Sequence, residues 1–284
     1  MKITITAATG QLGEFVTRES IKTFGKEKLR LAVRNPEKAE KYTEQGIEVV
    51  EADYMKPETL NRAFKDTELL IYIPSISHPS IVRVPESENV IGAAEKMKVG
   101  HFIFASFFCD QEDSPFHMSP FFGYTTRRLA CSKLKYTVLK NAMYADPLIP
   151  YLPELQEMGK LIYPVPHGEI SFISREESAK AIVKVASDPY FYGNTYILTQ
   201  DRNYTMYELA EILTGAGNKK IEFKPVSVEE FGKMYDEPEG FGVILASLYE
   251  AAEKNLLGMV TDDYRKIMGY KADDLETVIK KRIE

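Results

Sequence analysis

The sequence predicts an α/β fold, a doubly wound parallel sheet followed by a smaller C-terminal α/β lobe. Short β-branched runs alternate with longer helical patterns through the first half of the chain, as in βαβ units. The first of these runs leads through a glycine-containing turn into an amphipathic helix. With 284 residues, 44% of them hydrophobic and 27% charged, the chain can form a folded core without disulfide or metal support.

Strand and helix patterns follow one another in the order that repeated βαβ units require. The expected strands are 3–6, 29–33, 47–50, 69–73, 102–105 and 136–139. The helices expected between them are 11–24, 36–45, 57–64, 86–97 and 121–132. In the first helix Leu12, Phe15 and Val16 share one face, and Gly25 follows its end. Six strands with helical crossovers predict helices on both faces of the sheet.

The pattern changes after residue 145, where prolines interrupt the chain and short elements are expected first. Further on we expect helices 174–187 and 205–213, strands 195–198 and 220–223, and a mostly helical tail. Each helix begins with a capping-box pair, Ser174 with Glu177 and Thr205 with Glu208. We therefore expect a first domain over 1–145 and a smaller lobe over 146–284, with a segment near 194–199 returning to the main sheet.

Composition argues against several classes of function. The 36 basic and 42 acidic residues give a net charge of −6, which argues against nucleic-acid binding by bulk charge. Apolar runs are far shorter than the roughly 18 to 20 residues that a membrane span requires, so we expect no membrane-spanning segment. Cys109 and Cys131 form no redox or zinc motif, and the spacing of the four histidines predicts no metal site. Such cysteine usage favours the reducing cytoplasm.

The turn after the first predicted strand carries two glycines, Gly10 and Gly13. A dinucleotide pyrophosphate requires a tight strand-to-helix turn, close backbone approach and the positive end of a helix. We therefore expect the turn to bind a dinucleotide. The residues expected to contact it are Thr9, Gly10, Gln11, Leu12 and Gly13. The alternative is an ordinary turn in which the glycines only permit packing.

Arg34 follows the second predicted strand, at the position that faces the adenosine ribose in such folds. An acidic residue there would accept from the 2′-hydroxyl of NAD, whereas Arg34 offers a cation and several donors to a 2′-phosphate. Arg34 therefore predicts NADP(H), the alternative being a solvated surface arginine. Asp53, beyond the third strand, could accept from the adenine amino group or serve only as a turn residue.

These motifs resemble the NmrA-like branch of the atypical short-chain dehydrogenase/reductases, most closely the bacterial type-two NADPH:quinone oxidoreductases. The resemblance rests on residues 8–13 (ATGQLG), 33–36 (VRNP), 52–54 (ADY) and 139–144 (LKNAMY), and extends more loosely through 195–198 and 207–210. It implies a Rossmann-type NADP-binding domain and a small C-terminal substrate lobe. The family pattern is usually GxxGxxG, and this chain has Ala7 at the first glycine. That methyl group is tolerable at a negative φ and costly at a positive one.

Further site residues follow from the resemblance and from the rule that ligands bind at the carboxyl ends of parallel strands. Pro74 and Ser75 are expected to border the cofactor after the fourth strand, and Ser106 after the fifth. Asn141, after the sixth strand, lies where family members contact the nicotinamide or the substrate. We place it among both the cofactor-binding and the catalytic residues.

Catalytic chemistry in ordinary short-chain dehydrogenases uses Tyr-x-x-x-Lys on a helix, because residues four apart share a face. The corresponding residues here are Tyr124 and Arg128. Arg128 retains a positive charge but cannot pass on a proton. Tyr124 is thus a catalytic candidate and Arg128 a cofactor contact, or else the two form a structural helix pair. Hydride transfer to a quinone relaxes the need for a tyrosine acid, since water can protonate the product.

Aromatic residues gather after the fifth predicted strand, in an arrangement suited to a flat acceptor. They are Phe107, Phe108, Phe116, Phe121, Phe122 and Tyr124. We expect Phe107, Phe108, His117 and Tyr144 to contact the substrate, the alternative being core packing for the phenylalanines and an ordinary surface position for His117.

The leading hypothesis is an NADP(H)-dependent oxidoreductase that transfers a hydride to a quinone or a similar planar electrophile. Its expected partner is this small-molecule acceptor. One alternative is a redox sensor that binds NADP(H), catalyses nothing and contacts a protein partner. The other is an enzyme similar to nucleoside-diphosphate-sugar epimerases, which need a tyrosine acid and base.

Overall fold

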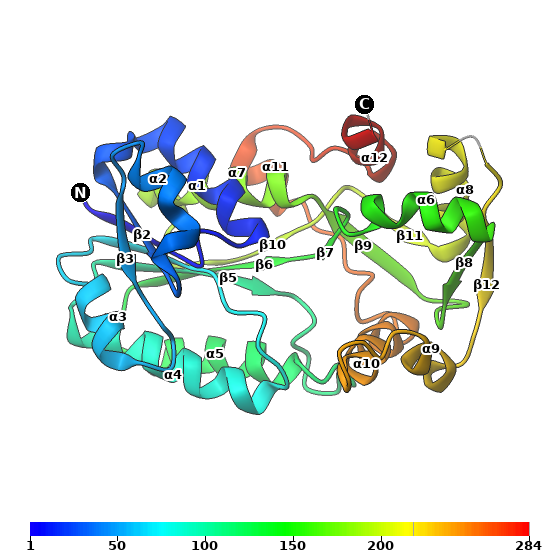
Figure 1. The fold of residues 1–284 in the computed structure, drawn as a ribbon, viewed down its shortest axis with the longest axis horizontal. Helices are drawn as coiled ribbons and strands as arrows, with labels where there is room; N and C mark the ends of the chain where they lie inside the picture. The colour runs from blue at the N-terminus through cyan, green and yellow to red at the C-terminus, as the bar shows by residue number, and fades with distance from the viewer. Residues whose placement is uncertain (218, 284) are drawn as a thin grey trace. The chain divides into compact units, whose positions relative to one another are not determined.

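A seven-stranded sheet in the order β10-β6-β5-β4-β1-β2-β3 is the largest sheet of the computed structural model, which describes residues 1–217 and 219–283 (Figure 1). Its strands are β1 (Ile3–Thr6), β2 (Leu29–Val33), β3 (Glu48–Glu51), β4 (Leu69–Tyr72), β5 (His101–Phe107), β6 (Tyr136–Asn141) and β10 (Thr195–Leu198). The pairs β1–β2, β1–β4, β2–β3 and β4–β5 are parallel. β10 thus forms an edge strand where the sequence predicted a returning segment.

Helices cover both faces of this sheet. They are α1 (Gln11–Phe24), α2 (Glu40–Thr43), α3 (Pro57–Ala63), α4 (Ser80–Lys96), α5 (Ser119–Ala130) and α7 (Arg175–Ser187), with 3₁₀ turns η1 (Lys26–Lys28), η2 (Pro36–Ala39) and η3 (Pro189–Phe191). In Figure 1, α1, α2 and α7 lie on one face of the sheet and α3, α4 and α5 on the other. The doubly wound, Rossmann-type fold predicted from the sequence is confirmed.

The chain divides into two compact units, each built from separate stretches of sequence. The first comprises Met1–Ser106, Phe121–Lys140 and Arg175–Tyr196, and the second comprises Phe107–Pro120, Asn141–Ser174 and Ile197–Glu284. The sequence predicted instead a single boundary near residue 145. A helix that follows residue 145, α7, therefore belongs to the first unit, where it packs against α1.

The second unit contains the smaller sheets and most of the C-terminal helices. Its strands are β7 (Met143–Tyr144), β8 (Lys160–Tyr163), β9 (Glu169–Ile173), β11 (Asn203–Thr205) and β12 (Glu222–Pro225), in sheets ordered β11-β9-β7 and β12-β8. Its helices are α6 (Leu148–Met158), α8 (Met206–Gly217), α9 (Val228–Met234), α10 (Phe241–Glu253), α11 (Asp263–Met268) and α12 (Leu275–Ile283). The Thr205–Glu208 capping box is formed, with hydrogen bonds of 2.9 Å and 3.2 Å.

Several helix boundaries differ from those that the sequence predicts. α4 begins at Ser80 rather than at residue 86 and contains Pro85, and the expected helix 36–45 is a 3₁₀ turn followed by a short α-helix. α6 forms across Pro153 in a region where we expected only short elements. The burial of Leu148, Leu152 and Leu155 on one face stabilises α6 despite the hydrogen bond lost at the proline.

The core of the first unit lies on both faces of the central strands. All residues of β1 and β4 are buried, as expected of parallel strands covered on two sides. Tyr72 stacks on Phe104 with ring centroids 5.5 Å apart, and Phe121 meets Phe104 edge-on at 6.5 Å. Phe121 is therefore a core residue.

A buried histidine connects the β5–β6 side of the sheet to the segment before β10. The Nε2 atom of His101 lies 2.9 Å from Oγ1 of Thr137, which accepts a hydrogen bond from the Gly193 N–H at 3.0 Å. The Thr137 hydroxyl can therefore donate its own hydrogen to a neutral imidazole. The ring also stacks on Tyr192 at 3.7 Å. Burial, assisted by the charge of Lys135, lowers the pKa of His101 from 6.5 to about 4.

We expect stability to depend on pH through His101. Because its pKa is lower in the folded state, the unfolded state binds more protons between pH 6.5 and 4. The stabilisation from neutral His101 is complete above pH 6.5 and is lost progressively as the pH falls to 4, where the loss is at most about 3.4 kcal/mol. Urea unfolding across this range should show a weaker pH dependence in His101→Gln than in wild type. The exposed His167 supplies the control His167→Gln, and equal slopes in all three proteins would contradict the assignment.

Candidate functional site

The turn between β1 and α1 is shaped by two glycines. Gly10 is the N-cap residue of α1, and no side chain caps the helix. A Cβ atom on Gly13 would lie 2.1 Å from the carbonyl oxygen of Ala7, and one on Gly10 would lie 3.2 Å from it. Gly13 is thus required for the approach of α1 to the turn. The N–H groups of the first helical turn stay open to an anion because no side chain occupies them.

Ala7 adopts a left-handed backbone conformation, with φ of 49°. Its carbonyl oxygen accepts a hydrogen bond from the Gly10 N–H at 2.9 Å, which closes the turn. Left-handed geometry costs an alanine about 1 to 2 kcal/mol relative to its usual conformations. The substitution of alanine for the family's first glycine is therefore of the costly kind.

Arg34 lies directly after β2, at the carboxyl edge of the sheet. It is exposed, and its guanidinium makes no hydrogen bond or ion pair with residues that the structure describes. The next residue, Asn35, instead caps η2 by accepting from the Glu37 N–H at 3.0 Å. Asp53 acts in its own turn, accepting from the Met55 N–H at 2.9 Å. Arg34 therefore has an open cation, whereas the Asp53 carboxylate is engaged locally.

The end of β4 is tied to the end of β1. The Ile73 N–H donates to Oγ1 of Thr6 at 2.9 Å, and the Ile73 carbonyl accepts from the Tyr54 hydroxyl at 2.6 Å. Pro74 and Ser75 follow, both half-buried. Because β1, β2, β4 and β5 run parallel, the glycine turn, Arg34, Ser75 and the buried Ser106 lie at one edge of the sheet.

Tyr124 and Arg128 lie on α5 and contact carboxylates of α4. The Tyr124 hydroxyl donates to Glu88, and this hydrogen bond raises the pKa of Tyr124. Arg128 donates to both Glu88 oxygens at 3.1 Å and to Glu95 at 3.0 Å. A tyrosine bound to a carboxylate is a poor catalytic acid or base. The geometry favours the structural helix pair over a catalytic pair.

The second unit contains the residues predicted to contact the acceptor. Phe108 is 2% exposed, and Phe107 meets it edge-on at 5.7 Å. Asn141 is buried, and its carbonyl accepts from the Phe108 N–H at 3.2 Å. Tyr144 is half-buried in β7, opposite Ile173. Phe107 and Tyr144 are therefore accessible in part, whereas Phe108 is packed in the core.

His117 lines a hollow of about 290 Å³ between α9 and α10. Its backbone N–H donates to Oγ of Ser247 at 3.1 Å. The other lining residues are Val228, Glu229, Gly232, Lys233, Asp236, Val243, Ala246 and Glu250. A hollow lined by both apolar and charged residues can accommodate a small organic ligand.

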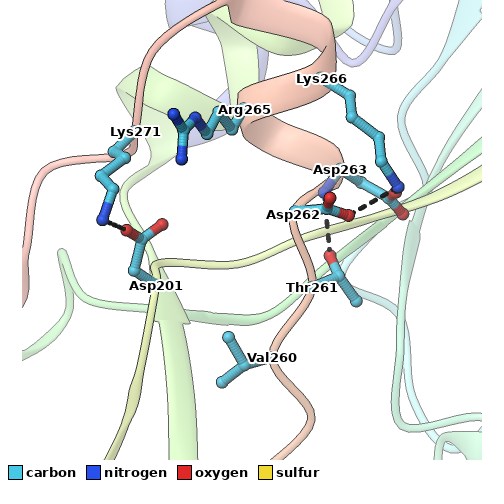
Figure 2. A pocket seen from close by; sticks show the side chains of 8 residues that line it. All are labelled: Asp201, Val260, Thr261, Asp262, Asp263, Arg265, Lys266 and Lys271. Carbon is cyan, nitrogen blue, oxygen red and sulfur yellow. Dashed lines mark hydrogen bonds and ion pairs between the residues drawn. The ribbon is translucent and has the colours of Figure 1, made fainter.

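A larger open hollow of about 720 Å³ lies beside α11 (Figure 2). Figure 2 shows Lys271 directed at Asp201 and Lys266 directed at Asp262, and both pairs are ion pairs. The remaining residues that line it are Val260, Thr261, Asp263 and Arg265. It contains none of the residues predicted from the sequence, and most of its charges neutralise one another.

Within residues 1–217 and 219–283, no group of three or more histidine, cysteine or acidic side chains is arranged to hold a metal ion. In the same part of the chain, no helix has the length and apolar character needed to span a membrane. Both cysteines are free thiols, Cys109 buried and Cys131 exposed.

One charged residue near the sheet edge was missed by the sequence analysis. Glu86, on α4, accepts hydrogen bonds from Ser75 and Ser77. We expected α4 to begin at this residue, which concealed the helical turn that aims its carboxylate back at the preceding loop. The sequence pattern gave no indication of this role, because the partners of Glu86 lie in the loop before the helix.

Comparisons with known proteins agree with this architecture. The model of the NmrA-like family matches residues 1–275. Quinone oxidoreductase 2 of Escherichia coli strain K12 is 31% identical over 276 residues, 96% of each chain. The crystal structure of the NADPH-dependent quinone oxidoreductase of Escherichia coli with NADPH has a TM-score of 0.93 at 29% identity, covering 99% of this chain and 100% of that one.

Two further solved structures show the same fold. One, described as a nucleoside-diphosphate-sugar epimerase from Staphylococcus aureus, has a TM-score of 0.95 at 40% identity, over 99% of this chain and 100% of that one. Citrobacter triphenylmethane reductase complexed with NADP(H) has a TM-score of 0.92 at 29% identity, over 99% of each chain. The resemblance inferred from the motifs is confirmed: the chain belongs to the NmrA-like family.

Proposed function

We propose that the protein is an NADP(H)-dependent oxidoreductase that reduces a quinone or a similar planar electrophile. One observation carries the proposal: the uncapped glycine turn before α1 shares a sheet edge with Arg34, whose exposed guanidinium has no partner in the described chain. The relatives that bind NADPH or act on quinones support it.

The residues present fit the cofactor. Gly13 lets α1 approach the turn closely, because a Cβ atom there would meet the Ala7 carbonyl, and the first turn of α1 can supply N–H donors to a pyrophosphate. Thr9, Gly10, Gln11 and Leu12 would surround the same phosphates. Arg34 would bind the 2′-phosphate, and Pro74, Ser75 and Ser106 would form the wall at the ends of β4 and β5.

When bound, NADPH supplies a hydride equivalent. The chain's residues orient the acceptor and leave its protonation to solvent, because the hydroxyl of Tyr124 is engaged by Glu88. We assign the acceptor to the second unit's Asn141, Tyr144 and Phe107, with Phe108 as packing support. His117 would contact it from the loop after β5.

Two other functions compete with this proposal. A nucleoside-diphosphate-sugar epimerase is suggested by the description of the Staphylococcus aureus structure, but the Tyr124–Glu88 hydrogen bond and Arg128 in place of lysine argue against tyrosine acid–base chemistry. A redox sensor would bind NADP(H) and contact a protein partner. NADPH oxidation should therefore be measured against a panel of quinones and aldehydes. Turnover with quinones supports the proposal, and tight binding without turnover supports the sensor.

We further propose a cytoplasmic location. Cys131 is an exposed free thiol, and cysteines without disulfide partners are typical of reducing compartments.

The first prediction concerns the choice of cofactor. Arg34→Ala should weaken NADPH binding by about 1.5 to 3 kcal/mol, the scale of a charge-assisted hydrogen bond, and leave NADH binding nearly unchanged. Calorimetric titration measures both affinities. Arg62→Ala, at another exposed arginine, is the control. Equal affinities of wild type for the two cofactors would contradict the assignment.

A second prediction concerns the strained turn. Ala7→Gly removes the strain of a left-handed alanine, which should raise the free energy of unfolding by about 1 to 2 kcal/mol. The added freedom of the unfolded chain should lower it by about 0.4 to 1 kcal/mol. The variant should therefore melt at a higher temperature and bind NADPH at least as tightly. Ala8→Gly, at a buried neighbour whose φ is not positive, should instead destabilise the protein. A less stable Ala7→Gly protein would show that the turn does not store this strain.

The third prediction distinguishes hydride transfer without a protein acid from general acid catalysis by Tyr124. Tyr124→Phe removes the hydroxyl but keeps the ring, so quinone reduction should lose less than about tenfold in kcat, or roughly 1.4 kcal/mol of barrier. A general acid would lose about 10²- to 10⁴-fold. Steady-state kinetics at saturating NADPH distinguishes these outcomes, and a loss in the larger range would return the protein to carbonyl reduction with Tyr124 as its acid.

A further inference from the structure

A buried carboxylate fixes the loop that follows β4. Glu86 is 6% exposed and lies in the first half of α4. The Ser75 hydroxyl donates to one of its oxygens, and the Ser77 hydroxyl donates to the other at 2.9 Å. The Ser77 N–H in turn donates to Oγ of Ser75 at 3.1 Å. Both polar side chains of this three-residue loop are therefore bound to one group on the helix.

Arg83 fixes the same loop through its backbone. Its Nε donates to the carbonyl oxygen of Ser77, and its guanidinium carbon lies 5.4 Å from the centre of the Phe121 ring. Burial lowers the pKa of Arg83, so the charged form is held in a poorly solvated place. Glu86 and Arg83, one turn apart on α4, each direct their hydrogen bonds at the loop.

Two charged side chains are desolvated in order to hold this loop. Burying a carboxylate or a guanidinium is unfavourable before its hydrogen bonds are counted, and apolar packing could anchor a loop without this penalty. The hydrogen bonds define the positions of the two serine hydroxyls and of the Ser77 carbonyl. The segment also exposes three aliphatic side chains, Ile76 (89%), Ile81 (75%) and Val82 (39%). Ile76 lies in the loop and the other two at the start of α4, where exposed apolar side chains are available to be covered by a ligand.

The loop lies where a dinucleotide would bind. It continues from Ile73, which is hydrogen-bonded to Thr6 directly before the glycine turn. Ser75 is thus two residues from a backbone atom tied to the end of β1. Ligands of open α/β sheets bind outside these strand ends.

We propose that Glu86 is a positioning residue that fixes the loop Ser75–Ser77 as a wall of the NADP(H) site, an inference that rests on the proposed function. The Ser75 hydroxyl donates its hydrogen to Glu86 and accepts from Ser77. It can therefore offer the cofactor only an acceptor, which suits a hydroxyl or carboxamide donor of the cofactor. Glu86 thus acts through Ser75 and takes no part in hydride or proton transfer.

Glu86→Gln tests the proposal in the full chain. The amide leaves one loop hydroxyl without its carboxylate, so the Kd for NADPH should rise about tenfold, the scale of one charge-assisted hydrogen bond, while kcat at saturating NADPH changes less than about twofold. Glu95→Gln is the matched control, because Glu95 is also on α4 and accepts from Arg128 and from the Lys133 N–H, both at 3.0 Å. The control should retain the wild-type Kd.

A double-mutant cycle distinguishes positioning from general stabilisation. If Glu86 acts through Ser75, Ser75→Ala should raise the Kd on its own but add little to Glu86→Gln. If Glu86→Gln fails to fold, the Kd for NADPH of Ser75→Ala and of Ser77→Ala tests the proposal instead. A folded Glu86→Gln protein with a lower melting temperature and an unchanged Kd would overturn the inference, as would additive effects in the cycle. Absence of NADPH binding by wild type would instead overturn the proposed function and the inference with it.

Discussion

The close approach of α1 to the turn after β1 is the constraint on which the rest of the first unit depends. Gly13 can carry no side chain because the Ala7 carbonyl occupies that space, and Ala7 takes a left-handed conformation to close the turn. The same turn leaves the first amides of α1 uncapped and is tied through Thr6 to the end of β4. Strain, open donors and a fixed neighbouring strand therefore coincide at one point of the sheet edge, as expected where structure is specialised for a ligand.

The charged residues of the first unit differ in what they contact, and we infer their roles from these contacts. On α4 and α5, Glu88, Glu95, Tyr124 and Arg128 satisfy one another, which fixes two helices and leaves little chemistry to the tyrosine. At the sheet edge Glu86 holds a loop instead of another charge. Arg34 contacts none of the residues described and so retains its capacity to bind a phosphate. The same residue types thus serve packing in one place and, in the proposed function, recognition in another.

The sequence predicted the fold well because its information was local. Periodicity placed α1 with the bounds that the structure has, and Gly10 and Gly13 lie in the turn before it and in its first turn, as the sequence predicted. It failed where tertiary packing overrides local preference: Pro153 lies inside α6 because three leucines on one face are buried. Among the proposed site residues, Gly10, Gly13 and Arg34 could be proposed from the sequence. The contacts of Glu86 could not, since they appear only when α4 and the preceding loop are seen together. The partners of Tyr124 were equally hidden, because Glu88 is distant in sequence.

The central claim is that this chain transfers a hydride from NADPH to a planar acceptor. The most direct measurement is anaerobic turnover with NADPH deuterated at the transferred position, with NADPH consumption and quinone reduction followed together. The account predicts one NADPH consumed per quinone reduced, deuterium lost from the nicotinamide, and much slower turnover with NADH. NADPH that stays bound and unoxidised in the presence of every quinone tested would contradict it.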